Sequence, residues 1–492
     1  MLKKILILIT IALFSCSCSS SYKDAAAIGE EPDIYPDYAG IILPYNISPM
    51  NFLVNNDGDR FIVELKGGGS SLKLRGPKVR IPENKWRNIL EESKGKTIRF
   101  CIYVKRQGEW KKLNDIVNAV SSDPIDNYVT YRLIEPGYSG YSKIVLRQRD
   151  LTSFKENDLY NSHLISGRID QQCINCHSFQ NFNADRFQLH ARQTKGGTVI
   201  AEGNKSKKLA FKTGDLISNA VYPSWHPHEN LIAYSVNSTE QLFHMKNRQK
   251  IEVYDNASDL ILYDVDTDEV TYIVNDSLSY ETFPYWSQDG RTLYYASAYL
   301  PSFGADSSTE AKRITERIRY NIYSVSFNPE DRTFGTPTLV LDAVKDSLSA
   351  VTPRPSPDGK YLLSGVGDYG SFHIWHESGD IYLTDLSTGE TRPLNEINSP
   401  RADSFKCWSS NSRWIIFTSR RDDGNYTRLY ITYFDENGKA GKPFMLPQKD
   451  PYQNLRLFKS YNVPELTKDK TTLGPKDIER ILLSEPIQVE QI

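Results

Sequence analysis

The chain has 492 residues, enough for two or three domains or for one large repeat architecture with an appendage. Its 59 Lys and Arg nearly balance its 61 Asp and Glu, so no global field points to nucleic acid as a partner. The 30 Tyr and 20 Phe favour strands, and 29 Gly with 25 Pro supply turns. This composition predicts an all-β fold.

Residues 1–16 are typical of a lipoprotein signal peptide. Lys3 and Lys4 precede an apolar run at 5–14, which is too short to span a bilayer. The segment ending at Cys16 resembles the bacterial lipobox, and this resemblance implies a lipid on that thiol, with Cys18 as the alternative. A simple cleaved signal peptide is the other reading. We expect a monomer anchored to the outer membrane through Cys16, on its periplasmic or its surface-exposed face, and soluble beyond the anchor.

Two segments separate the signal peptide from the rest of the chain. Residues 17–38 are Ser-rich and then contain Asp, Glu and Pro, which predicts a tether. Residues 39–122 predict a small β-sandwich-like domain with strands near 61–65, 72–74 and 98–104. A short helix is expected to open at Pro82 and to end near Gly95.

A repeat organises residues 123–450. A tight turn of the Pro-Asp-Gly-Lys kind follows His226, Ser287, Ser356 and Ser409, and it leads each time into an alternating strand and a second hairpin. Two hairpins make one propeller blade, and several blades must close a ring. We predict six or seven blades, with strands near 128–149 and 197–211 completing the ring. Residues 451–492 are expected to be a C-terminal tail, which is polar and peripheral after Glu465 and has one helix at 475–483.

These repeats resemble the TolB-like propeller blades, whose W-S-P-D-G-K turn they share over residues 205–450. The whole mature chain also resembles a group of lipoproteins from Bacteroidetes-type bacteria that combine this propeller with a C-x-x-C-H motif. That second likeness is carried by six segments, at residues 47–52, 131–134, 173–179, 409–414, 443–448 and 460–465.

The motif that carries chemistry is Cys173-Ile174-Asn175-Cys176-His177. C-x-x-C-H is the arrangement to which one haem c is covalently attached, with both thiols as thioether anchors and the imidazole as proximal iron ligand. We expect it to lie in a strand-poor insert at 153–195 of the propeller. Covalent haem attachment occurs outside the cytoplasm, and an exported protein meets this requirement.

The sixth position of the iron has three candidates. His190 is the leading distal ligand, followed by His163, and Met245 is the third. Three alternatives to haem remain open. The two thiols could form a disulfide, bind zinc together with His177 and His190, or be inert.

The remaining Cys and His residues do not indicate a further functional site. Cys101 and Cys407 look like buried core thiols without a mutual disulfide, and His373 and His376 look like satisfied core or rim side chains. The chain contains no G-x-S-x-G elbow, phosphate loop or H-E-x-x-H, which favours a non-enzymatic protein. The leading hypothesis is electron transfer or redox sensing by haem c. The alternative is a TolB-like scaffold that binds protein or glycan in the envelope.

Overall fold

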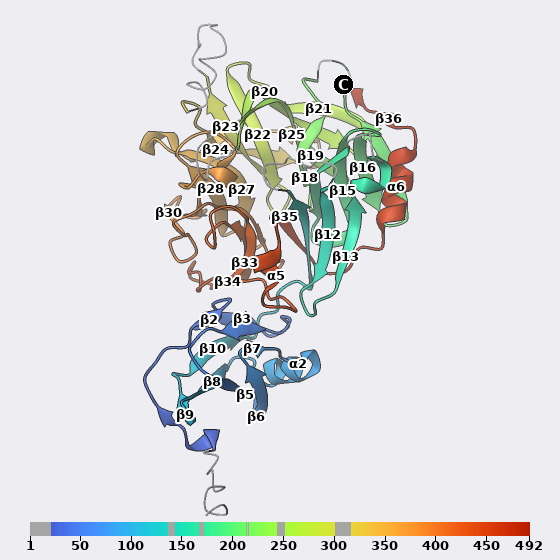
Figure 1. Cartoon of the computed structure of the whole chain (residues 1–492). Coiled ribbons are helices and arrows are strands. Elements are labelled where there is room, and N and C mark those ends of the chain that lie inside the picture. Colours follow the sequence, from blue (N-terminus) through green and yellow to red (C-terminus); the bar gives the residue numbers. More distant parts are fainter. Residues whose placement is uncertain are drawn as a thin grey trace, which may run out of the picture.

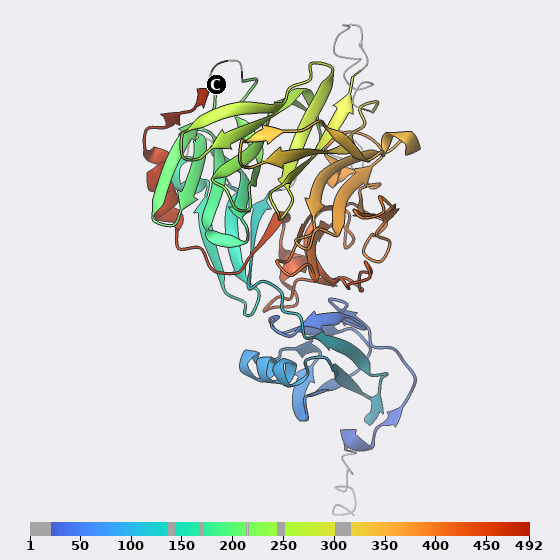
Figure 2. The same ribbon diagram turned by 180° about the vertical axis from the view of Figure 1, so that it is seen from behind.

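The computed structural model describes residues 21–135, 143–166, 172–212, 214, 216–243, 251–300 and 316–492. A small first domain lies at one side of a large ring of sheets (Figure 1). Figure 2 shows the same two parts from behind. The predicted signal peptide, its Cys16 and Met245 fall outside the described residues. No helix within the described ranges is long and apolar enough to cross a membrane.

The first domain consists of two sheets and one helix. The larger sheet contains β1 (Ala26–Ala27), β3 (Ile42–Pro44), β5 (Arg60–Gly67), β6 (Ser70–Gly76), β8 (Thr97–Arg106), β9 (Glu109–Lys112) and β10 (Ile116–Ser121). The smaller sheet contains β2 (Ile34–Tyr35), β4 (Phe52–Val54) and β7 (Lys78–Val79). Helix α2 (Glu83–Glu92) follows Pro82 and buries one apolar face through Trp86, Ile89 and Leu90, as the sequence predicted.

The prediction of a free tether is wrong for its described part, residues 21–38. The 3-10 turn η1 (Tyr22–Asp24) packs on the first domain, where the ring of Tyr22 lies 5.2 Å from that of Tyr103. Glu30 forms an ion pair with Arg106, and β1 and β2 pair with strands of the two sheets. Pairing and aromatic packing therefore order the chain from Ser21 onward.

Six sheets form the propeller within the described residues, and their colours follow the chain around the ring in Figure 1. Blade one contains β11 (Tyr128–Ile134), β12 (Val145–Asp150) and β13 (Glu156–Asn161). Blade two contains β14 (Gln172–Gln180), β15 (Asn183–Gln193), β16 (Gly197–Glu202) and β17 (Lys205–Ala210). Blade three contains β18 (Ala220–Trp225), β19 (Leu231–Phe243), β20 (Ile251–Asp264) and β21 (Glu269–Val274).

Blades four to six continue the ring. Blade four contains β22 (Ser279–Trp286), β23 (Thr292–Tyr299), β24 (Asn321–Asn328), β25 (Thr333–Phe334) and β26 (Thr338–Leu341). Blade five contains β27 (Ser349–Pro355), β28 (Tyr361–Gly367), β29 (Asp380–Asp385) and β30 (Thr391–Pro393). Blade six contains β31 (Asp403–Trp408), β32 (Trp414–Ser419), β33 (Arg428–Tyr433) and β34 (Phe444–Met445). Short helical turns at α3 (His163–Ser166), η4 (Val344–Asp346), η5 (His373–Trp375) and α5 (Gln453–Arg456) lie between strands.

The repeated turn predicted from the sequence is present. In blade five, Ser356 Oγ donates to Asp358 Oδ1 at 2.6 Å and Gly359 adopts a φ of 72°. In blade six, Ser409 Oγ makes the matching bond to Asn411 Oδ1 at 2.6 Å. The small polar side chain that closes the turn and the residue of positive φ explain why this motif recurs.

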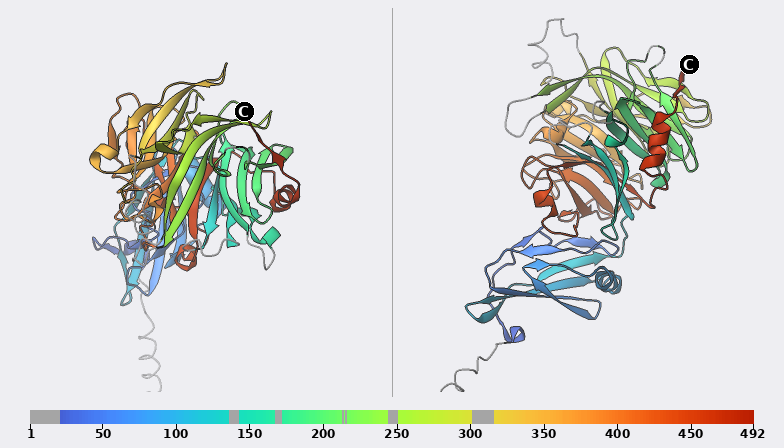
Figure 3. Two further views of the ribbon diagram at one scale, coloured as in Figure 1. Left: turned by 90° about the horizontal axis from the view of Figure 1, so that it is seen from above. Right: turned by 45° about the vertical axis from the view of Figure 1, so that its right-hand side comes forward.

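The C-terminal segment is not a peripheral tail, so that prediction is wrong. Strand β35 (Ser460–Thr467) pairs with β11 and becomes the innermost strand of blade one, which closes the ring (Figure 1). Helix α6 (Pro475–Leu483) is in the predicted place, but it lies against the ring, as the red helix in Figure 3 shows. It buries Ile478 and Leu482 against blades one and two. Strands β36 (Ile487–Gln488) and β37 (Glu490–Gln491) extend blades two and three.

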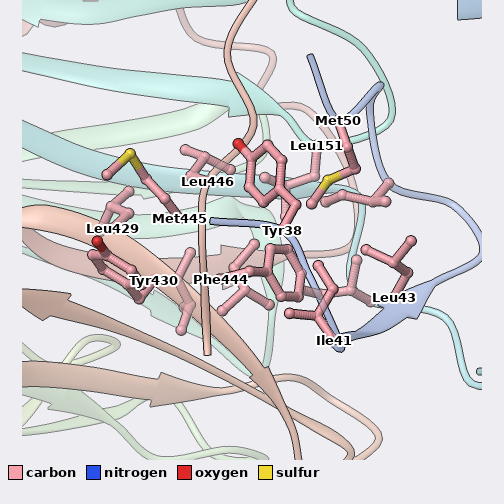
Figure 4. Close-up of a cluster of buried hydrophobic side chains, with 14 of the residues drawn as sticks. Tyr38, Ile41, Leu43, Met50, Leu151, Leu429, Tyr430, Phe444, Met445 and Leu446 are labelled. Atoms are coloured by element: carbon pink, nitrogen blue, oxygen red, sulfur yellow. The ribbon is translucent and has the colours of Figure 1, made fainter. Parts of the chain in front are cut away.

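The first domain is packed onto the ring through an apolar cluster. Tyr38, Ile41 and Met50 meet Phe444 and Leu446 of blade six, all buried (Figure 4). Burial of large apolar side chains is the main stabilising contribution at such contacts. The two domains therefore share one core.

Candidate functional site

The C-x-x-C-H motif lies on β14, the innermost strand of blade two, and the prediction of a strand-poor insert at 153–195 is wrong. Strands β13, β14 and β15 account for most of that segment, as members of blades one and two. Cys173 pairs with Arg192 and Asn175 pairs with His190 across the sheet. The motif is therefore part of the repeat itself.

A bulge in β14 sets the direction of the motif. The pairing register slips between Asn175 and Ser178, so Cys176 and His177 are unpaired. The innermost strands of all five other blades slip in the same way. In four of those blades the first bulged residue has a positive φ, as Cys176 does (49°): Tyr222 (49°), Phe283 (54°), Thr352 (51°) and Val463 (44°). Such a bulge re-aims two side chains toward the axis of the ring.

His177 occupies a position that four sister blades fill with proline. The residue after the positive φ is Pro223, Pro284, Pro353 or Pro464. Proline suits a bulge because its missing N–H forfeits no pairing there. Cys176-His177-Ser178-Phe179 thus corresponds to Tyr222-Pro223-Ser224-Trp225. Sequence reasoning missed this correspondence, although the shared four-residue pattern was present to be found.

One cavity at the axis of the propeller brings the motif together. Cys173, Cys176 and His177 all line it, and it encloses about 1200 Å³ of space, part of which is open to solvent. Aromatic and proline side chains from other blades form its walls, namely Tyr222, Pro223, Phe283, Pro284, Phe372 and Phe405. The predicted anchors and the predicted proximal ligand therefore face a common space with both apolar and polar walls.

His177 is buried without a well-aligned partner. Its side chain is 2% exposed, and neither ring nitrogen makes a well-aligned hydrogen bond to a described residue, although the backbone of Thr130 and of Val463 lies close enough to favour the protonated ring. Burial lowers the pKa of His177 to about 3, and the nearby Arg132 adds to the shift, whereas the backbone of Thr130 and Val463 opposes it. A buried polar group normally has a partner, so an imidazole whose two nitrogens lack well-aligned hydrogen bonds needs an explanation.

The two thiols differ in their surroundings. Cys173 is 8% exposed and its Sγ accepts a hydrogen bond from Asn175 Nδ2 at 3.1 Å. Burial raises the pKa of this thiol, and the charges of Arg192 and Arg132 partly offset that effect. Cys176 is only half-buried, and neither residue is in a disulfide. Both sulfurs are thus free within the same cavity.

Arg132 connects the motif to the closure of the ring. Its guanidinium donates to Oδ1 of Asn175 on β14 and to Oδ1 of Asn462 on β35. Both Asn side chains stand directly before the bulge of their strand. The guanidinium group of Arg132 therefore fixes the side-chain amide of Asn175, which donates its hydrogen bond to Cys173.

Charged side chains gather around the same cavity. Arg132, Arg192 and Arg354 line it together with one carboxyl, Glu465. Burial raises the pKa of Glu465 to about 8, and Arg354 limits that rise. A cavity with three guanidinium groups favours an anionic ligand.

Neither of the two described candidates for the distal ligand lines the cavity. His190 is buried in β15, with Nδ1 2.9 Å from Thr198 Oγ1, and it is not among the residues that line the cavity. His163 is exposed at the start of α3, away from the lining. Met245 lies outside the described residues. The described ranges hold no cluster of three His, Cys, Asp or Glu that would bind a metal ion on its own, so the zinc alternative gains no support.

The other thiols and histidines have structural surroundings. Cys101 and Cys407 are buried and free, which confirms the prediction of core thiols. His226 Nε2 is 2.9 Å from the carbonyl oxygen of Gly290, which links the turns of blades three and four. His373 and His376 are buried at the rim, as predicted, within and beside η5.

Comparison with known proteins yields a likeness of fold. No protein-family model and no curated protein matches the chain. TolB from Acinetobacter baumannii has a similar structure, with 14% identity and a TM-score of 0.44, over 88% of this chain and 98% of that one. A hypothetical selenium-binding protein from Sulfolobus tokodaii has 8% identity and a TM-score of 0.42, over 72% and 96%. The tricorn protease has 11% identity and a TM-score of 0.34, over 80% and 38%. The sheet order of the chain itself identifies the fold as a β-propeller.

Proposed function

We propose that the propeller holds one covalent haem c at its axis. The observation that carries this proposal is the cavity itself, in which two free thiols and a buried imidazole with no well-aligned hydrogen bond face the same space. A neutral imidazole with an available nitrogen is the usual proximal ligand of haem iron. The residues present therefore fit the group.

Each part of the group has a counterpart in the cavity. Cys173 and Cys176 are the anchors for the two vinyl groups, and His177 is the proximal ligand. The aromatic walls suit the apolar face of a porphyrin, and the guanidinium groups of Arg132, Arg192 and Arg354 suit its two propionate carboxylates.

Haem supplies one-electron redox chemistry when it is bound, and the protein supplies its binding and its electrostatic surroundings. Side chains from several blades line the cavity, which is partly open to solvent. We therefore propose electron transfer or redox sensing in the cell envelope.

A difference spectrum tests the proposal. The full chain is expressed with a haem-attachment system, purified and measured in reduced-minus-oxidised mode. The wild type is expected to give the α-band of a c-type haem, and the Cys173→Ala/Cys176→Ala double variant is expected to lose it. Cys101→Ala and Cys407→Ala are matched controls, because both thiols are buried outside the cavity and their loss should leave the band unchanged. A wild type without the band refutes the proposal.

A second candidate function rests on the other end of the axis. There, a smaller pocket is lined by Phe179, Trp225, Tyr285, Trp286 and Trp408. Of these, Phe179 and Tyr285 are partly exposed, whereas the three Trp side chains are buried. Aromatic side chains are enriched at protein-binding surfaces, so this mouth suits a TolB-like scaffold that binds an envelope protein or a glycan. The double cysteine variant would retain such a partner in a pull-down, whereas a haem-dependent partner would be lost.

The predicted envelope location belongs to the same proposal. Cys16 would carry the lipid that holds the protein at the outer membrane, and Ser21 onward would be part of the folded domain. Replacing Cys16 with Ala is expected to move the protein from the membrane fraction to the soluble fraction. An unchanged distribution would contradict the anchor.

A further inference from the structure

The hairpin of β19 and β20 is much longer than its counterparts in the other blades. Its first half belongs to the sheet of blade three, where β18 pairs with β19 up to Val236 and β21 pairs with β20 up to Leu260. Beyond those residues, 237–243 and 251–258 pair only with each other among the described strands. We call these two segments the ribbon, which extends about 20 Å past the sheet.

The ribbon lies along the cavity that holds the C-x-x-C-H motif. Asn237, Thr239 and Gln241 of one segment and Val253 of the other are part of the cavity lining. A bulge between Ser238 and Thr239 marks the place where the ribbon leaves the sheet. Bulges bend a strand pair, so this position is suited to aim the ribbon at the mouth of the cavity.

Contacts with two other blades hold the ribbon in place. Asp255 accepts hydrogen bonds from Tyr320, before β24 of blade four, at 2.9 Å and from Asn237 at 2.8 Å. Ile251 packs against Ile374 and Trp375 in η5, a turn of blade five. The ribbon therefore reaches past its neighbour to the second blade along the ring.

One buried hydrogen-bonded pair joins the ribbon to blade five. Glu252 Oε2 lies 2.6 Å from His376 Nε2, and the two side chains are 1% and 3% exposed. Removing one member of a buried pair leaves the other without compensation, which strongly destabilises the contact. An isolated two-stranded ribbon is marginally stable in water, so its position depends on such lateral contacts.

We propose that the ribbon is a strap across the mouth of the cavity and that the Glu252–His376 pair is its latch. The latch controls how readily small solutes reach Cys176, the half-buried thiol of the cavity. This inference goes beyond the proposed haem function, because it concerns access to the cavity whatever the cavity holds.

Thiol labelling tests the latch without haem. The full chain is made without haem attachment, so that both thiols are free, and Cys176 is labelled with N-ethylmaleimide and with a bulky maleimide. Glu252→Ala and His376→Ala are each expected to accelerate labelling of Cys176 at least about tenfold. The effect should be larger for the bulky reagent. The double variant should add little to either single change, because both break the same contact.

Glu240→Ala is the matched control. Glu240 lies on the same ribbon, but its carboxylate accepts hydrogen bonds only from Tyr254 and Asn256 of the ribbon in the described structure. Its loss should leave the labelling rate within about twofold of the wild type. Labelling of buried Cys101 is followed in parallel to register global unfolding. Equal rates for the wild type and the latch variants would overturn the proposal, and so would equal acceleration at Cys101 and Cys176.

Discussion

Replacing His177 with proline tests the place of the motif in the blade. The backbone of Cys176 already has the conformation that precedes Pro223, Pro284, Pro353 and Pro464 in the sister blades. A proline at a compatible position changes stability by less than about 1 kcal/mol, often favourably, because it restricts the unfolded chain. The variant also removes a buried imidazole without a well-aligned hydrogen bond. We expect its free energy of unfolding to stay within about 1 kcal/mol of the wild type.

Leu189→Pro provides the contrast. Leu189 is fully buried opposite the bulge, in β15, which pairs with a neighbour on each side. Proline there removes a pairing N–H and leaves a core cavity, for a cost of at least about 3 kcal/mol. Urea unfolding of both variants, made without haem, measures the difference. A His177→Pro protein that loses more than about 3 kcal/mol would refute the equivalence between His177 and the sister prolines.

The same variant separates stability from haem binding. Expressed with the attachment system, His177→Pro is expected to fold and to lose the spectrum of the wild type, because the proximal nitrogen is gone. An unchanged spectrum would show that His177 is not the proximal ligand.

Three further predictions concern the ring. A chain that ends at Phe458 lacks β35 and should lose cooperative unfolding, because blade one loses its innermost strand; an unchanged melt would contradict ring closure. Ile478→Ala should cost about 2–5 kcal/mol in urea unfolding, while Leu483→Ala, half exposed on the same helix, should cost little. Burial raises the pKa of Asp255 to about 6 from 3.8. Between these two pKa values the folded state binds more protons than the unfolded state. The free energy of unfolding of the wild type should therefore rise as pH falls from about 7 to about 5 and should fall as pH rises. Asp255→Asn should lack this pH-dependent contribution. Equal pH profiles for the two proteins would contradict it.

Local patterns predicted much of the fold. The turn at Ser356 and Asp358 and the strand that follows it are set by short-range bonds, so the repeat could be recognised and the blades placed. Helix α2 was equally readable, since its N-terminal proline and its apolar face lie within ten residues. Six blades result, at the lower end of the predicted range.

Elements that depend on distant partners were not predictable from local pattern. Strand β35 is held by β11, and the bond from Arg132 to Asn462 spans 330 residues of sequence. Strand β14 contains Gln, Asn, His and Ser, which have low strand propensity, and tertiary pairing overrides that preference. The anchors and the proximal histidine were found because they form one contiguous motif, whereas the walls and the arginines come from several blades.

Peptide mass spectrometry of the mature protein tests the central claim most directly. The protein is produced with a haem-attachment system and digested, and the peptide that contains Cys173 and Cys176 is weighed. The account predicts that this peptide carries the mass of one haem through both sulfurs, while Cys101 and Cys407 remain unmodified. Recovery of the peptide with two free thiols, or with a disulfide, would contradict it.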